Sequence, residues 1–300
     1  MNKLCILMAT YNGRKYLDSQ LKSILNQSFS EFDLYISDDG STDGTNQILK
    51  GYEKLDERVH VLKINNKSCG PLQNFKGLIN YVSSKNYKYI MFSDQDDIWY
   101  KDKIKSTLVF MKCNENGPTL IYTNYKENDF RGKINPKYND GFPLNKYPIL
   151  LYQNWIMGCT MMINSSLLSL SKDIPDEADN HDNWIVLVAL TYGRIVYFSK
   201  TTMFHRVHTS NVTNNFKNRG LIHKGNKFIK DVVNGGSFRF RKKQLCKKIL
   251  SLPVISRTNY VESFYDCLDI DSKFKRMMVL KEINIKGLNY HKTMKLFLMI

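Results

Sequence analysis

Three acidic side chains lie within four residues of the chain, directly after a short apolar run at residues 89–92. They are Asp94, Asp96 and Asp97. Like charges held close together are unfavourable unless a cation neutralises them. Carboxylate oxygens that share a hard divalent cation with a phosphate group meet this requirement. We therefore predict that Asp94 and Asp96 form part of a site for a divalent cation and a phosphorylated ligand.

A second acidic segment follows another apolar run, at residues 32–37. It includes Asp39 and Asp43, together with two glycines and two hydroxyl residues. Aspartate is also common in turns and at helix N-termini, and we interpret Asp43 and the later Asp102 in this way. Carboxylates thus follow two separate apolar runs.

Short apolar runs alternate with amphipathic stretches in this part of the chain. The runs span residues 4–9, 32–37, 59–64 and 89–92. Strands that alternate with helices predict β-α-β units and a mostly parallel sheet with helices on both faces, which is an α/β fold. In such sheets the ligand lies beyond the carboxyl ends of the strands. The loops after the first, second and fourth runs should therefore meet at one edge.

The overall composition excludes some classes of protein and leaves others open. Of the 300 residues, 42% are hydrophobic, which excludes a largely disordered chain. The net charge of +16 indicates an anionic partner, such as nucleic acid, phosphate groups or a membrane surface. Residues 216–300 carry 19 basic and 6 acidic residues, so +13 of this charge lies in the last third.

Cysteine usage and hydropathy predict a cytoplasmic protein. The six cysteines are scattered singly, without a metal-ligand spacing or a disulfide framework. The apolar run at residues 4–9 is too short for the core of a signal peptide. Since no apolar stretch reaches the length of a membrane span, we expect membrane contact only at the surface.

Three segments resemble the signatures of the family 2 glycosyltransferases. They are Ala-Thr-Tyr-Asn-Gly at residues 9–13, Ser-Asp-Asp-Gly-Ser-Thr-Asp-Gly-Thr at 37–45 and Ser-Asp-Gln-Asp-Asp-Ile-Trp at 93–99. The last of these, and His-Asp-Asn-Trp at residues 181–184, are similar to the bacterial rhamnosyltransferase-like branch, which builds capsule, O-antigen and wall polysaccharides. The likeness extends to about residue 215.

The resemblance implies a GT-A fold and a division of the chain. Residues 1–125 would form the nucleotide-sugar-binding half and residues 126–215 the acceptor-binding half of one domain. Residues 216–300 would form a basic, mainly helical extension.

The resemblance also implies which residues bind the donor. Thr10 and Asp39 would contact the base and ribose of a nucleotide-sugar. Tyr11, Asn12 and Asn74 would line the same pocket.

A metal site is implied next to this pocket. Asp94 and Asp96 would be the D-x-D pair, with Asp96 the more direct ligand of Mn²⁺ or Mg²⁺. The metal would bridge the diphosphate and stabilise the charge on the leaving nucleotide. Arg206 would hold the diphosphate by bidentate contacts. His208 is either a further metal or phosphate contact or a structural histidine.

Asp182 has two interpretations. It stands at the start of an apolar helical stretch, where a carboxylate is favoured by the helix dipole. It also matches the position of the family's catalytic base. An inverting transfer needs such a carboxylate to accept the proton of the acceptor hydroxyl. We favour the base. Gly158 is interpreted as either a close approach to substrate or a packing residue.

The predicted function is an inverting, metal-dependent glycosyltransferase. Its donor would be dTDP-L-rhamnose or a UDP-hexose, and its acceptor a saccharide, most simply one linked to polyprenyl diphosphate. The alternatives are a basic protein that binds nucleic acid or membrane through a GT-A-like scaffold without activity, and a nucleotidyltransferase. No nucleic-acid-binding motif appears, so nucleic acid is not expected as a partner. A nucleotidyltransferase would require a glycine-rich phosphate loop after the first strand, whereas this chain has Thr-Tyr-Asn-Gly there.

The C-terminal third contains a predicted basic helix at residues 239–252. Its lysines and arginines flank a stripe that includes Leu245 and Ile249. One hypothesis is that this helix docks on the anionic inner face of the plasma membrane. The other is that the region is a helical subdomain that packs Val261, Phe264 and Leu268 on the main domain.

Overall fold

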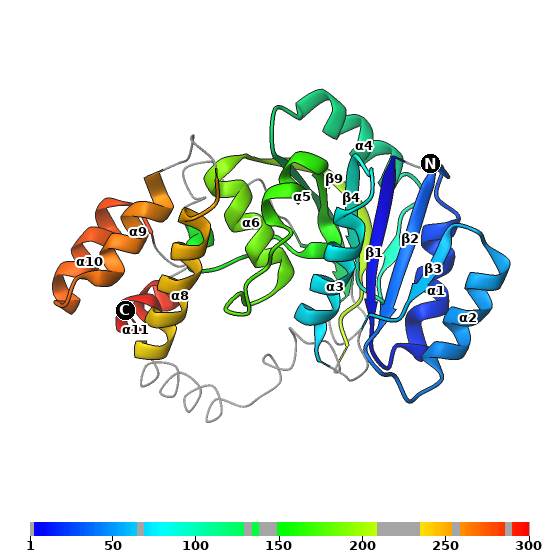
Figure 1. Cartoon of the computed structure of the whole chain (residues 1–300), viewed down its shortest axis with the longest axis horizontal. Helices are drawn as coiled ribbons and strands as arrows, with labels where there is room; N and C mark the ends of the chain where they lie inside the picture. Colours follow the sequence, from blue (N-terminus) through cyan, green and yellow to red (C-terminus); the bar gives the residue numbers. More distant parts are fainter. Residues whose placement is uncertain are drawn as a thin grey trace.

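The computed structural model describes residues 3–64, 69–128, 134–137, 149–208, 235–253, 259–285 and 290–299 (Figure 1). The strands are β1 (Leu4–Thr10), β2 (Phe32–Asp38), β3 (Val59–Leu62), β4 (Tyr89–Ser93), β5 (Ile98–Trp99), β6 (Thr119–Asn128), β7 (Ile134–Lys137), β8 (Met161–Asn164) and β9 (Arg194–His205). The helices are α1 (Arg14–Leu25), α2 (Thr45–Leu55), α3 (Pro71–Ser83), α4 (Lys103–Asn114), α5 (Ser165–Ser171), α6 (His181–Tyr192), α8 (Gly235–Leu250), α9 (Asn259–Asp269), α10 (Lys273–Glu282) and α11 (Tyr290–Met299), with a short 3-10 turn at Gly158–Thr160.

The strands form one mixed sheet. Their order is β3-β2-β1-β4-β8-β6-β9-β5, with β7 paired to β6. Strands β3, β2, β1 and β4 are parallel, β8 runs antiparallel between β4 and β6, and β9 pairs parallel with β6. The register aligns Thr10 with Asp38 and Met8 with Ser93. The loops that follow β1, β2 and β4 therefore leave the sheet at the same edge.

Helices cover both faces of this sheet, because the strands bury apolar side chains on both sides. On β1, Cys5 and Leu7 belong to the core beneath α3, α5 and α6, whereas Ile6 and Met8 belong to the core beneath α1, α2 and α4. Full burial of one such side chain contributes about 1.5–3 kcal/mol. The predicted α/β fold is confirmed, and the sheet is mixed only beyond β4.

The predicted division of the chain can be placed on these elements. The division at residue 125 falls within β6, a continuous strand whose pairing with β9 shifts register between Thr123 and Tyr125. The division at residue 215 lies outside the described residues.

The predicted basic helix forms α8, and its apolar stripe faces the protein. Leu245 and Ile249 are buried in the same core as α6, and the Tyr192 hydroxyl donates to the Ile249 carbonyl at 2.8 Å. Val261 and Phe264 of α9 lie in that core as well. In Figure 1, α8 stands between α6 and the outer helices α9 and α10. Among the described residues, no helix has the length and apolar character needed to cross a membrane.

Gly193 lets β9 begin directly beside β6. A Cβ atom at this position would lie 2.3 Å from the Pro118 carbonyl oxygen, which is backbone and cannot turn aside. The same carbonyl accepts the amide hydrogen of Arg194 at 2.9 Å. Since β9 leads into residues 205–208, this close approach helps to set the position of the candidate site.

We predict opposite effects for the same substitution at two glycines. Gly193→Ala should destabilise the protein by about 1–3 kcal/mol because the new methyl group overpacks the junction. Gly51→Ala, in α2 where a Cβ meets nothing within 4 Å, should stabilise it by about 0.5–1 kcal/mol. Thermal unfolding of the two variants checks this, and equal midpoints would contradict the packing at Gly193.

Candidate active site

The loops after β1 and β4 are joined by Gln95. The amide of Tyr11 donates to Gln95 Oε1 at 2.9 Å, and Gln95 Nε2 donates back to the Tyr11 carbonyl at 2.9 Å. A Cβ at Gly13 would lie 2.1 Å from Gln95 Oε1, so this glycine makes room for the amide. The Tyr11 side chain itself is exposed. The sequence analysis missed Gln95 because the motif draws attention to the acids on either side of it.

The loop after β2 is held to the end of β1 by Asp38. The hydroxyl of Thr10 donates to Asp38 Oδ1 at 2.8 Å, and the amide of Ser41 donates to Asp38 Oδ2 at 2.8 Å. Asn12 adds a second link, since its Oδ1 accepts the amide of Thr42 at 2.9 Å. Thr10 is thus buried with its hydroxyl in use, and the two loops form one rigid rim.

Asp43 has the structural role that its turn context predicts. Its Oδ2 accepts the Arg14 amide at 3.0 Å, and its Oδ1 accepts the hydroxyl of Thr45 at 2.6 Å. Asp102 stands directly before α4 and accepts the Ser28 hydroxyl at 2.6 Å. Both carboxylates fix loops outside the acid cluster.

Asp39 and Asn74 connect β2 to the start of α3. Asp39 accepts the amides of Cys69 and Gly70, each at 2.9 Å, and is 5% exposed. Asn74 donates from Nδ2 to the Ser37 carbonyl at 2.9 Å and is 1% exposed. Both side chains thus hydrogen-bond to backbone groups and hold the start of α3 against the end of β2.

Asp96, Arg206 and His208 come together from the ends of β4 and β9. His208 Nε2 lies 2.7 Å from Asp96 Oδ2, and Arg206 Nε donates to the Asp96 carbonyl at 3.0 Å. Tyr16 of α1 lies against both of them, with its ring 4.8 Å from the His208 ring and 4.8 Å from the Arg206 guanidinium carbon. The sequence grouped the first three residues but gave no signal for Tyr16, a single aromatic on a helix.

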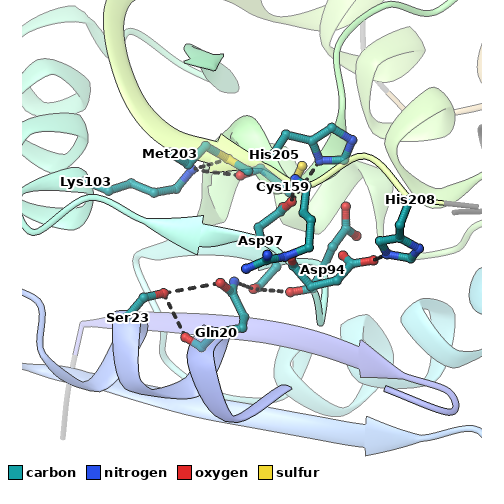
Figure 2. A network of polar contacts seen from close by, with 12 residues as sticks. Gln20, Ser23, Asp94, Asp97, Lys103, Cys159, Met203, His205 and His208 are labelled. Atoms are coloured by element: carbon teal, nitrogen blue, oxygen red, sulfur yellow. Dashed lines mark hydrogen bonds and ion pairs between the residues drawn. The ribbon is translucent and has the colours of Figure 1, made fainter. Parts of the chain in front are cut away.

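A second cluster lies close to Asp96; three of its four residues are buried and Asp94 is half-buried. One ligand atom from each of Asp94, Asp97, Cys159 and His205 lies within 4.8 Å of the others. His205 Nδ1 is 2.8 Å from Asp97 Oδ1, and Figure 2 shows the two side chains beside Asp94. Lys103 of α4 reaches this cluster from the left in Figure 2, and its Nζ donates to the Cys159 carbonyl at 2.8 Å.

Burial and mutual repulsion alter the ionisation of this cluster. Burial, with the charges of Asp97 and Asp96, raises the pKa of Asp94 to about 7. Burial and Asp97 likewise raise the pKa of Asp96, against the effect of His208. Burial opposes the charged form of His205, but Asp97 and the other acids prevail and raise its pKa to about 9. His205 is therefore a cation at neutral pH.

Lys103 is the second internal cation. Burial lowers its pKa to about 8, although Cys159, Asp97 and Asp94 favour its charged form. The sequence analysis missed it because a lysine at the first position of a helix is usually solvated.

The donor set fits a hard divalent cation. Asp94 and Asp96 offer carboxylate oxygens, and burial first, then the charges of the neighbouring acids, raise their pKa values. A divalent cation would stabilise their charged forms. Asp97 Oδ2 is buried and has no hydrogen-bond partner among the described residues. Burial holds the pKa of the Cys159 thiol well above its usual value, so that residue stays a neutral thiol. Asp94, Asp96 and His208 are the residues that would hold the cation.

Asp182 lies in the first turn of α6, and Asn180 occupies the capping position. Asp182 Oδ2 accepts the Gly158 amide at 3.2 Å, and Asp182 Oδ1 accepts the Asn183 amide at 2.6 Å. Burial raises the pKa of Asp182 to about 6, partly offset by these amides. At neutral pH it is a carboxylate whose basicity suits proton transfer.

His181 and Gly158 pack together beside Asp182. The His181 ring stacks on Phe75 at 3.8 Å, and burial lowers its pKa to about 3, so the imidazole is neutral. A Cβ at Gly158 would lie 2.6 Å from His181 Nε2. This contact favours the packing interpretation of Gly158.

Comparison with known sequences agrees with the geometry of this edge. A family model described as Glycosyl transferase family 2 matches residues 5–168. The dTDP-rhamnosyl transferase RfbG of Shigella flexneri is 35% identical over 218 residues, which are 68% of this chain and 72% of that protein. TuaG of Bacillus subtilis (strain 168), a glycosyltransferase named for teichuronic acid biosynthesis, is 34% identical over 168 residues, 53% of this chain and 61% of TuaG.

Solved structures share the fold at low sequence identity. S. aureus TarS 1–349 in complex with UDP-GlcNAc has a TM-score of 0.60 and 16% identity, covering 94% of this chain and 80% of that one. The mannosyltransferase PcManGT of Pyrobaculum calidifontis, in complex with GDP-Man and Mn²⁺, has a TM-score of 0.51 and 12% identity, with coverage of 94% and 73%.

Proposed function

Because the chain belongs to family 2 of the glycosyltransferases, we propose that it is an inverting, metal-dependent enzyme that transfers a sugar from a nucleotide-diphospho-sugar to a saccharide. The observation that carries this proposal is the convergence of Asp96, His208 and Arg206 at the carboxyl edge of the sheet. Acid, imidazole and guanidinium lie where the phosphates of a nucleotide would sit.

We propose dTDP-L-rhamnose or a UDP-hexose as the donor. The name of RfbG supports the first, and the UDP-GlcNAc complex of TarS is consistent with the second. Thr10, Tyr11, Asn12, Asp39 and Asn74 would shape the pocket for base and ribose. Turnover measured with a panel of nucleotide-sugars separates the two donors.

The chain's own residues divide the work of the reaction. A bound Mn²⁺ or Mg²⁺ supplies Lewis-acid stabilisation of the leaving diphosphate. The positively charged guanidinium of Arg206 stabilises the negative charge of the same leaving group. Asp182 accepts the proton of the acceptor hydroxyl as that oxygen attacks the anomeric carbon. A single displacement of this kind inverts the configuration at that carbon.

We propose that the product belongs to a bacterial surface polysaccharide such as capsule, O-antigen or wall polymer. The name of TuaG, a teichuronic acid enzyme, supports this assignment. A polyprenyl-diphosphate-linked saccharide is the proposed acceptor, because such polymers are assembled at a membrane.

We propose peripheral membrane contact through α10 rather than α8, whose apolar stripe is buried. Phe274 and Met278 are 70% and 45% exposed, one helical turn apart, and Lys275 and Lys281 lie on the same helix. Aromatic and aliphatic groups beside lysines are typical of helices that bind anionic lipid surfaces.

We predict that a divalent metal is required and that Asp96 holds it. Chelation by EDTA should abolish transfer, and Mn²⁺ or Mg²⁺ should restore it. Asp96→Ala should lower kcat by at least about 10²-fold, because the charge on the leaving group loses its stabilisation. Asp102→Ala, an aspartate outside the cluster, serves as the control and should keep full activity. Unchanged transfer in chelator would exclude metal dependence.

We predict that Asp182→Asn loses turnover but still binds the donor. Removal of a positioned base lowers kcat by about 10²–10⁴-fold. Asp176→Asn is the matched control, since Asp176 lies in the segment before α6 and pairs with Lys76 at 2.9 Å. Donor binding and single-turnover rates check the prediction. If Asp182→Asn lost only stability and kept its rate per folded molecule, Asp182 would be a helix-stabilising residue.

We predict that co-sedimentation with vesicles depends on the apolar side chains of α10. Phe274→Ser with Met278→Ser should lose binding to anionic vesicles, whereas Val109→Ser, at a 57% exposed position on α4, should retain it. Point variants are preferable to truncation before α8, which would uncover the core at α6. Equal binding of the wild-type protein to neutral vesicles, or retention in the α10 variant, would refute this docking face.

A further inference from the structure

A buried lysine joins the C-terminal region to the segment that precedes Asp182. Lys242 of α8 is 2% exposed, and its Nζ donates to Asp179 Oδ2 at 2.9 Å. Arg241 lies 3.2 Å from the other oxygen of the same carboxylate. A lysine is rarely buried unless an acid compensates its charge. The contact with Asp179 therefore determines where α8 sits against this segment.

The segment before α6 is acidic, and α8 lies along it. Asp173, Asp176 and Glu177 line a cleft whose opposite wall includes Lys247 and Lys248 of α8. Part of the positive charge of the C-terminal third thus faces this chain's own acidic segment. The sequence analysis attributed that charge to an external anionic partner.

Asp179 lies three residues before Asp182, outside α6, and its charge acts on the candidate base. Burial is the largest cause of the raised pKa of Asp182; the amides of Asn183 and Gly158 lower that pKa, and the charge of Asp179 raises it. Among the described residues, the other groups that act on the pKa of Asp182 are neutral: the Asn154 side chain and the amides of Gly158 and Asn183. The His181 ring beside Gly158 is also uncharged. Lys242 and Arg241 are the charged groups on α8 that face Asp179.

We propose that Lys242 is a positioning residue for the transfer reaction: through its contact with Asp179 it fixes the segment that carries Asp182 and neutralises the charge next to that base. The inference rests on the proposed role of Asp182. It gives the C-terminal helix α8 a part in catalysis that acts through Asp179.

The neighbouring residue provides a matched control. Lys243 also lies on α8, but it pairs with Asp269 of α9, on the side away from α6. Lys243→Met therefore removes the same charge from the next position of the same helix without touching the acidic segment.

The test is the pH dependence of kcat for Lys242→Met, Asp179→Asn, the double variant and Lys243→Met, each expressed per folded molecule. Lys242→Met leaves Asp179 with Arg241 as its remaining cation, so more of its negative charge acts on Asp182, the pKa of Asp182 rises and the acid limb moves to higher pH. Asp179→Asn removes the negative charge, so the limb moves to lower pH. Each shift should be on the order of 0.5–1 pH unit.

The remaining variants complete the pattern. The double variant should fall between the two single variants, and Lys243→Met should match the wild type. The maximal kcat of Lys242→Met should fall about tenfold, since small misplacements of a base are costly, while the KM for the donor changes by less than about twofold. A purely structural role for Lys242 predicts no opposed shifts.

Two outcomes separate this inference from the proposed function. If Asp182→Asn loses turnover but the profiles of Lys242→Met and Asp179→Asn coincide or shift in the same direction, Asp182 remains the base and the inference is wrong. If Asp182→Asn keeps its turnover, the assignment of the base fails first. Should Lys242→Met not fold, the downward shift of Asp179→Asn alone decides the question.

Discussion

The structure of the site depends on the repulsion among three carboxylates at the end of β4. Asp94, Asp96 and Asp97 are partly or wholly removed from water, where their charges are weakly screened. The surrounding fold supplies two cations at close range. His205 Nδ1 lies 2.8 Å from Asp97 Oδ1, and Lys103 Nζ donates to the Cys159 carbonyl at 2.8 Å. Burial, together with the charges of Asp97 and Asp96, still raises the pKa of Asp94 to about 7. The cost of keeping these carboxylates charged is the physical basis for the proposed divalent ion.

The long-range pairing of the sheet serves this requirement. Strand β9 pairs with β6 along most of its length and delivers His205, Arg206 and His208 to the end of β4, more than a hundred residues away in the chain. The 3-10 turn that precedes the antiparallel β8 carries Gly158 and Cys159. Gly158 packs closely against His181, and its amide donates to Asp182. The acid cluster after β4 and the contact of Asp182 with Gly158 therefore both depend on the pairing of this one sheet.

The sequence predicted the parts of the molecule that depend on local patterns. The first four strands and the acids after β2 and β4 follow from apolar runs and loop composition, and they lie where expected. The antiparallel direction of β8 and the partners Gln95, Tyr16 and Lys103 could not be predicted, because each depends on contacts between distant segments. Lys242 illustrates the same limit: a lysine in a basic helix reads as solvated, and only the fold reveals the aspartate opposite it. The excess charge of the C-terminal third consequently has an internal use that composition alone does not reveal.

The proposed function requires the carboxylate cluster to bind a divalent cation together with the phosphates of a nucleotide. Titration calorimetry of UDP and dTDP, with Mn²⁺ and in EDTA, tests this binding without reference to any acceptor or to turnover. We expect at least one nucleotide to bind about tenfold or more tightly with Mn²⁺, and Mn²⁺ in turn to bind more tightly when that nucleotide is present. Nucleotide affinities that are the same in Mn²⁺ and in EDTA would exclude a shared site for metal and phosphate.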